Sequence, residues 1–142
     1  MASLPSLHDR LQIWCYNKSV MNRSVFERLV AEALEALPDF FQEKLNNVAV
    51  VVEAWPNQET MRRASVHSPT EILGFYHGVP QTKRTHHYAL VPPDKISIYQ
   101  RPIEMRCRTV EQIRALVQHV LKHEIAHHFG LDDEQLRQIG AY

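Results

Sequence analysis

The sequence predicts an α+β fold in which a small, mixed or antiparallel β-sheet is backed by helices. Two stretches, 24–37 and 109–129, repeat apolar residues at helical spacing. Short segments rich in β-branched and aromatic residues lie between them, bounded by proline, glycine and asparagine. Strands grouped between helices, without a regular strand–helix alternation, are typical of α+β domains.

Length and charge set limits on the class of protein. The chain has 142 residues, which is enough for one domain with its own core. Lysine plus arginine and aspartate plus glutamate number 16 each, so there is no basic field that would favour nucleic acid, and we expect no nucleic-acid partner. No stretch approaches the roughly 20 apolar residues of a membrane span, and no signal-peptide pattern is present. We therefore expect no membrane association.

Cysteine usage favours a reducing, cytoplasmic location. The two cysteines, Cys15 and Cys107, lack the C-x-x-C spacing of a thiolate zinc site and are too few for a disulfide framework. Residues 1–23 show no clear period, and we interpret them as an N-terminal extension or arm. Residues 24–142 then form the single domain.

The first predicted helix begins at Ser24. Ser24 and Glu27 have the spacing of a capping box, in which each side chain satisfies a backbone N–H at the helix start. Apolar residues recur at helical spacing as far as Pro38, which ends the helix, and Asp39 opens a second, short helix.

The middle of the chain predicts strands. The β-branched segment 48–52 is interpreted as a buried strand, and the polar stretch 57–70 as a surface loop. Further strands are expected at 72–76, 88–91 and 95–100. In the last of these, apolar and polar residues alternate, so one face is buried and the other faces solvent or a ligand.

A long helix follows from Thr109. Thr109 and Gln112 form a second potential capping box, and Gly130 is a potential left-handed terminator, which gives a helix of about twenty residues. A short final helix is expected from Asp133 to Ile139.

The end of this long helix has the spacing of a zinc site. His123 and His127 are four residues apart, so on a helix both imidazoles lie on one face and can bind one ion. Gly130 allows the chain to turn back, so that Asp133 can supply a third, oxygen ligand. Three protein ligands leave one position for water, which is typical of a catalytic zinc site.

Glu124 has the position of a general base. It follows the first proposed ligand directly and therefore projects about 100° around the helix, beside the metal. A carboxylate at this position can take a proton from metal-activated water, and can return it to a leaving group. We therefore predict metal-assisted hydrolysis, with Glu124 as the catalytic residue.

Several neighbouring residues leave alternatives open. Asp132 is adjacent to Asp133, and either could cap the last helix while the other binds the metal; the spacing favours Asp133. His119 and His123 form a second H-x-x-x-H pair, but Val120 follows His119, so that pair would lack a base. We expect a hydrogen-bonded packing role for His128. Other side chains could reach the cleft, although none is assigned a role: His77, His86, His87, Tyr76, Tyr88 and Tyr99.

The segment from His123 to Asp133 has the pattern H-E-x-x-H-x-x-G-x-x-D, and in it the chain resembles a small bacterial family of zincin-like metallopeptidases. The resemblance extends to residues 26–38, 73–80 and 96–104. It implies a minimal zincin fold, with a curved sheet packed on the active-site helix and an edge strand, such as 95–100, that can pair with an extended peptide. It also implies one zinc ion, the ligands His123, His127 and Asp133, Glu124 as base, and peptide or protein substrates.

Two other classes remain as alternatives. One is a protein that keeps the fold and the metal for binding without catalysis. The other is a metal-dependent ribonuclease of zincin-like fold, which has a third histidine where this chain has Asp133 and lacks the glutamate after its first ligand. Glu124 and Asp133 both argue against the ribonuclease. The sequence does not indicate an oligomeric state.

Overall fold

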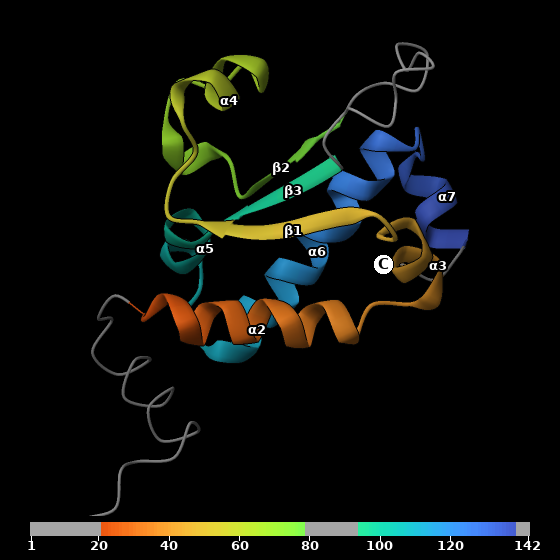
Figure 1. Cartoon of the computed structure of the whole chain (residues 1–142), viewed down its shortest axis with the longest axis horizontal. Helices are drawn as coiled ribbons and strands as arrows, with labels where there is room; N and C mark the ends of the chain where they lie inside the picture. Colours follow the sequence, from red (N-terminus) through yellow and green to blue (C-terminus); the bar gives the residue numbers. More distant parts are fainter. Residues whose placement is uncertain (1–20, 79–93, 139–142) are drawn as a thin grey trace, which may run out of the picture.

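The computed structural model describes residues 21–78 and 94–138, and these form an α+β domain as predicted (Figure 1). In chain order the elements are α2 (Arg23–Glu35), α3 (Asp39–Lys44), β1 (Val48–Glu53), α4 (Gln58–Arg63), the 3₁₀ turn η1 (Pro69–Glu71), β2 (Gly74–His77), β3 (Asp94–Tyr99), α5 (Gln100–Arg106), α6 (Val110–His128) and α7 (Asp133–Gln138). The strand expected at 88–91 and residues 1–20 lie outside the described residues.

The described sheet is mixed, with the strand order β1-β3-β2. β1 runs parallel to β3, with Val50 opposite Ile96, while β2 runs antiparallel to β3, with Tyr76 also opposite Ile96. β3 is therefore central, and the prediction that 95–100 is an edge strand is wrong. Its alternation predicted one buried face, but residues 96–99 are all buried. α6 packs against β3, and Thr60 of α4 contacts the Tyr99 hydroxyl. Residue Gln100 belongs to α5.

β1 and β2 are the outer strands of the described sheet. The prediction of a buried strand at 48–52 is confirmed in position, but only Val52 is fully buried and Ala49 is exposed. An outer strand that packs on helices along one face needs apolar residues mainly on that face, and β-branched residues on the other face still favour the extended conformation.

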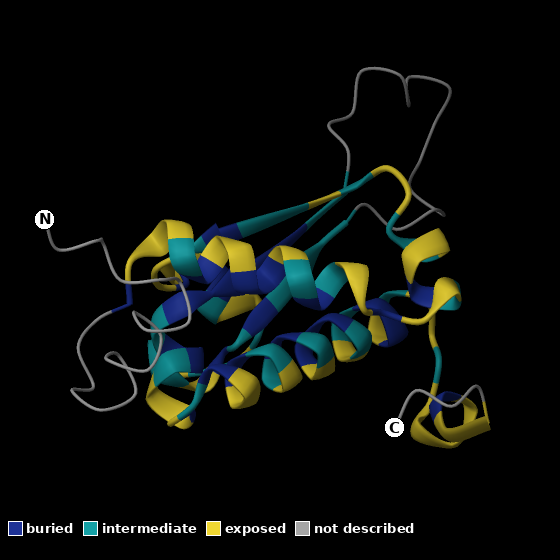
Figure 2. Ribbon diagram, turned by 90° about the horizontal axis from the view of Figure 1, so that it is seen from below, coloured by how far each residue is buried: buried dark blue, intermediate teal, exposed yellow. Residues whose placement is uncertain are grey.

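The core lies between the helices and the sheet. α2 packs against α6, and α6 lies against β2 and β3. Figure 2 shows the buried residues gathered along this interface and the exposed residues on the outer sides of the helices. Among the largest completely buried side chains are residues of α2, β3 and α6: Phe26, Leu29, Ile96, Ile98, Tyr99, Ile113 and Leu121. Burial of the apolar residues of α6 fixes the rotation of this helix about its axis. The directions of its other side chains follow from that rotation.

The start of α2 differs from the prediction. Asn22, not Ser24, is the N-cap, and its side-chain oxygen accepts hydrogen bonds from the backbone N–H and the hydroxyl of Ser24, each at 2.8 Å. Glu27 instead pairs with Arg23, at 3.1 Å. Asparagine caps a helix as well as serine does, so the sequence offered two capping residues only two positions apart. Met21, just before the cap, is buried in the core.

The prediction of a loop at 57–70 is wrong in part, because the segment contains α4 and leads into η1. The Asn57 side chain caps α4 by accepting a hydrogen bond from the Thr60 N–H at 2.8 Å. Ser68 and Glu71 form a capping box around η1. The sequence contains the residues of both caps, but these short helices lack a sustained apolar period, so they were not predicted. Of the described helices, none is long and apolar enough to span a bilayer.

Candidate metal centre

α6 places the candidate ligands at its C-terminal end. Its start is capped as predicted, because the Thr109 hydroxyl accepts a hydrogen bond from the Gln112 N–H at 3.1 Å. In a capping box, the Gln112 side chain would accept a hydrogen bond from the N–H of the N-cap residue. It accepts instead from the N–H of the preceding residue, Arg108, at 2.7 Å. The helix is therefore anchored at a defined residue, and the register of His123 and His127 follows from it.

Gly130 ends the helix as predicted. Its φ of +69° lies in the left-handed region that favours glycine. The N–H of Leu131 donates to the Ala126 carbonyl at 2.8 Å, and the N–H of Gly130 to the His127 carbonyl at 3.3 Å. These two bonds form a Schellman motif, which turns the chain directly after the candidate ligands.

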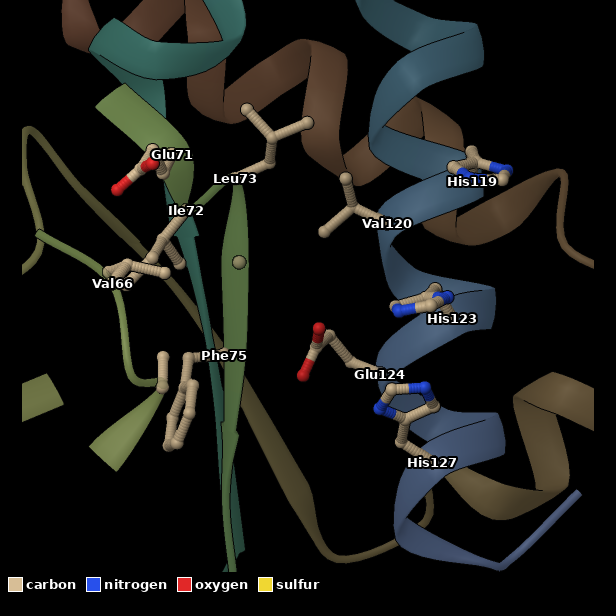
Figure 3. A pocket seen from close by; sticks show the side chains of 12 residues that line it. Val66, Glu71, Ile72, Leu73, Phe75, His119, Val120, His123, Glu124 and His127 are labelled. Atoms are coloured by element: carbon tan, nitrogen blue, oxygen red, sulfur yellow. The ribbon is translucent and has the colours of Figure 1, made fainter. Parts of the chain in front are cut away.

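The two candidate imidazoles lie close together. The ring centroids of His123 and His127 are 4.1 Å apart, whereas those of His119 and His123 are 6.3 Å apart. His123 and His127 line one rim of a cavity of about 440 Å³ that also reaches Glu124 (Figure 3). Both histidines are exposed at this rim, not turned fully toward the protein body. The closer pair is the one that the spacing of the motif favours.

Glu124 lies between this helix and the outer edge of β2 (Figure 3). Its Oε2 accepts a hydrogen bond from the backbone N–H of Tyr76 at 3.0 Å. Burial raises the pKa of the Glu124 carboxyl group, while the Tyr76 N–H and the nearby His127 oppose this rise in pKa. A half-buried carboxylate near His127 is suited to proton transfer.

The sheet register explains why the Tyr76 N–H points toward Glu124. Leu73 is opposite Tyr99, and the Tyr99 N–H donates to the Leu73 carbonyl at 2.9 Å. In an antiparallel pair, hydrogen-bonded and non-hydrogen-bonded positions alternate. The backbone groups of Gly74 and Tyr76 therefore point away from β3, toward the outer edge that faces α6.

Asp132 and Asp133 have different surroundings. Asp132 caps α7: its Oδ1 accepts from the Gln135 N–H at 2.8 Å, and the Gln135 side chain accepts from the Asp132 N–H at 2.9 Å. Asp133 is exposed in the first turn of α7, and its negative charge acts to raise the pKa of His123. Burial is the largest effect on His123 and lowers its pKa, and the neighbouring His127 and His119 lower it further.

The donor set fits zinc, although the third residue is not gathered with the other two. Two imidazoles and a carboxylate are typical zinc ligands. Within residues 21–78 and 94–138, no three His, Cys, Asp or Glu side chains lie close enough together to hold a metal ion as they stand. The structure thus brings His123 and His127 together, while the Asp133 side chain does not join them closely enough to complete a three-ligand site.

His128 packs as the sequence predicted, but the contact of its ring with Asp94 is longer than the expected hydrogen bond. Its ring stacks on Tyr76 with centroids 3.9 Å apart, and its Nε2 lies 3.8 Å from Asp94 Oδ2. The Tyr76 hydroxyl donates to the same carboxylate oxygen at 3.0 Å. The contribution of Tyr76 was missed because it depends on a backbone N–H and on a ring contact, neither of which leaves a motif in the sequence.

Two of the remaining aromatic candidates, His77 and Tyr99, do not line the cavity. His77 lies 3.2 Å from the Ser97 hydroxyl, and Tyr99 is buried, with its hydroxyl bonded to Thr60 and Ser97 side chains. His86, His87 and Tyr88 lie outside the described residues.

A helix that carries two imidazoles and a carboxylate alongside the outer strand of a small mixed sheet is the arrangement of the zincin class of metallopeptidases. The family model described as zincin-like metallopeptidase matches residues 45–141. The chain belongs to this family, and the match includes every candidate site residue. Membership implies a zinc cofactor and peptide or protein substrates. A comparison with curated proteins finds no match.

Proposed function

We propose that this protein is a zinc-dependent peptidase that hydrolyses peptide bonds, with one zinc ion held by His123, His127 and Asp133 and with Glu124 as the general base. The observation that carries the proposal is the position of Glu124. Its carboxylate extends from the same helix as the imidazole pair and accepts the Tyr76 N–H at the outer edge of β2 at 3.0 Å. A base at this position lies between the metal ligands and a surface that can hold a peptide.

The proposed ligands and the proposed base have separate roles. His123, His127 and Asp133 hold the ion, which when bound would activate water and polarise the carbonyl of the scissile bond. Glu124 accepts a proton on its carboxylate and later returns it to the departing amine. The half-buried position of Glu124 strengthens the interactions of charges that develop beside it.

Asp133 is preferred over Asp132 because the Asp132 carboxylate already caps α7. Asp133 is exposed, so its side chain can rotate without disturbing a packed core. It is also close enough to His123 to affect that residue's pKa. The turn at Gly130 holds this aspartate near the helix end.

The outer edge of β2 is the proposed binding surface for an extended peptide. The backbone N–H and carbonyl of Gly74 point away from β3, so a substrate strand can pair with them beside Glu124, which itself accepts the Tyr76 N–H. This assigns to β2 the role that the sequence had suggested for residues 95–100.

Residues 24–142 are proposed to act as one domain, since α2 contributes to the same core as α6. The buried free thiol of Cys107 supports a reducing, cytoplasmic location.

The test is hydrolysis of a denatured-protein or peptide library, measured with and without zinc for wild type and for Glu124→Gln. We expect zinc-dependent cleavage that Glu124→Gln lowers about 10²- to 10⁴-fold, with zinc still bound. Glu111→Gln, an exposed glutamate in the first turn of the same helix, is the matched control and should cleave like wild type. If wild type and Glu124→Gln are equally inert while both bind zinc, the protein is a non-catalytic metal-binding member of the family.

A further inference from the structure

The cavity that reaches Glu124 continues along β2 toward residue 71 (Figure 3). Its volume of about 440 Å³ lies in the lower part of the range of roughly 300–1,000 Å³ found for ligand pockets. Half of its lining residues are apolar side chains: Ala64, Val66, Ile72, Leu73, Phe75 and Val120. The candidate base therefore opens directly onto an apolar compartment.

Two of the apolar lining residues, Val120 of α6 and Ile72 just before β2, are only 5% and 6% exposed. Gly74 makes the close approach of Val120 to β2 possible. A Cβ atom at Gly74 would lie 2.5 Å from Val120 Cγ1 and 3.0 Å from the Ser97 carbonyl oxygen. The absence of a side chain on β2 thus lets α6 pack closely against the strand at this point.

The segment after α4 supplies another wall, and hydrogen bonds hold it in place. Ala64 is the C-cap of α4, and the Val66 N–H donates to the Met61 carbonyl at 3.1 Å. Further along, Glu71 Oε2 accepts from the N–H groups of His67 and Ser68 at 3.0 and 2.9 Å. A wall fixed in this way can discriminate between side chains by size.

The polar lining residues are distributed unevenly. Glu71 and His119 are exposed and lie toward the end of the cavity away from His127, whereas His123, Glu124 and His127 lie at the candidate catalytic end (Figure 3). Between them the lining is apolar. A charged side chain placed there would lose water without gaining a partner, while an apolar one would be stabilised by burial.

We propose that this compartment is a specificity pocket that accepts an apolar side chain, of leucine or methionine size, from the substrate residue that flanks the scissile bond. The inference rests on the proposed peptidase function, because it takes the other end of the cavity to be the catalytic site. Ala64, Val66, Ile72 and Val120 are then specificity-determining residues, and none of them takes part in the chemistry.

The experiment changes the pocket at Ala64 and uses Ala36 as the matched control. Both alanines are helix C-caps with nearly identical backbone angles, φ −84°, ψ −4° at Ala64 and φ −86°, ψ −2° at Ala36, but Ala36 is exposed on α2. Ala64→Leu fills the pocket, and Ala64→Asp adds a charge. Ala36→Leu and Ala36→Asp make the same chemical changes away from it.

The readouts are the residues that flank the cleaved bonds in a peptide library, identified by mass spectrometry, and the zinc content. We expect wild type to prefer leucine or methionine over lysine and aspartate at one flanking position by at least about tenfold. Ala64→Leu should shift this preference toward alanine and glycine, and Ala64→Asp should raise the relative cleavage beside lysine. The Ala36 variants should keep the wild-type preference, and all four variants should bind zinc.

Binding of uncleaved peptides separates this inference from the proposed function. Blocked hexapeptides that differ only in one residue, leucine or lysine, are titrated into zinc-loaded Glu124→Gln and into Glu124→Gln with Ala64→Asp. Preferential binding of the leucine peptide, lost in the double variant, supports the pocket even if wild type cleaves nothing. Cleavage without any apolar preference, or equal binding of both peptides, would overturn the pocket while leaving the peptidase in place.

Discussion

Glu124 Oε2 of α6 accepts a hydrogen bond from the Tyr76 N–H of β2 at 3.0 Å, and this contact joins the candidate catalytic helix to the outer strand of the sheet. The carboxylate is therefore positioned by the strand as well as by the helix. The length of the glutamate side chain decides whether its carboxylate can reach the strand from the helix.

Glu124→Asp tests this dependence on reach. Aspartate keeps the charge but is one methylene shorter, so it cannot maintain the contact with the Tyr76 N–H from the same backbone position. Because a misplacement of about 1 Å can cost about 10²-fold in rate, we expect kcat to fall about 10²-fold. Zinc affinity should stay within a few-fold of wild type. Full activity in Glu124→Asp, measured by steady-state kinetics, would argue against precise placement by β2.

The turn after α6 should depend on glycine at position 130. Gly130 has φ +69°, and no atom lies within 4 Å of a Cβ added there, so the cost of alanine is conformational and not steric. We expect Gly130→Ala to lower the free energy of unfolding by about 1–2 kcal/mol. Gly130→Asn should lose less, since asparagine tolerates this conformation. Urea unfolding of both variants measures the difference, and equal losses would contradict the explanation.

The Tyr76–His128 stack should contribute to stability. Tyr76→Phe keeps the ring contact but removes the hydrogen bond to Asp94 at 3.0 Å, so we expect a loss of about 1 kcal/mol in the free energy of unfolding. Tyr76→Leu also removes the ring stacking and should lose a further 0.5–1.5 kcal/mol or so. If both variants unfold at the same denaturant concentration as wild type, the ring stack and the hydrogen bond of Tyr76 do not stabilise the fold.

His77 should make stability depend on pH. Burial, chiefly, and the charges of Lys95 and Arg63 lower the pKa of His77 below its usual value near 6.5, against the opposite effect of Glu53 and Glu59. The unfolded chain therefore takes up this proton first as the pH falls. The contribution of His77 to stability is complete above about pH 6.5 and decreases as the pH falls below that value toward the folded pKa.

Urea unfolding at pH 7.5 and pH 5.5 checks this for wild type and His77→Asn. The free energy of unfolding should decrease more on acidification in wild type than in the variant. An equal decrease in both proteins would show that His77 titrates alike in the folded and unfolded states.

Much of the domain could be predicted from the sequence because strong local signals coincide. The helical period from Ile113 onward, the cap at Thr109 and the turn at Gly130 all point to the same helix, and its bounds in the structure agree within a residue. The β-branched segment 48–52 likewise lies in β1. These elements depend on residues that are close together in the chain.

The errors concern features that depend on distant residues or on competing local ones. Strand order is set by which strands pair, so the central position of β3 could not be read from its own alternation. The N-cap of α2 is Asn22 and not the predicted Ser24, because two good capping residues lie near each other in the sequence. At the site, the pair His123–His127 followed from helical spacing, whereas the contact between Glu124 and Tyr76 spans 48 residues and depends on the fold.

Zinc binding by wild type, Asp133→Asn and Asp132→Asn tests the central claim most directly, by calorimetric titration and elemental analysis. We predict one zinc ion per chain in wild type. Removing a residue that only orients a metal ligand lowers metal affinity roughly 10- to 100-fold. Asp133→Asn removes a ligand itself and should lower zinc affinity by more than that. Asp132→Asn should bind like wild type, because asparagine also caps a helix. Absence of zinc from wild type, or equal affinities of the two variants, would contradict the proposed metal centre.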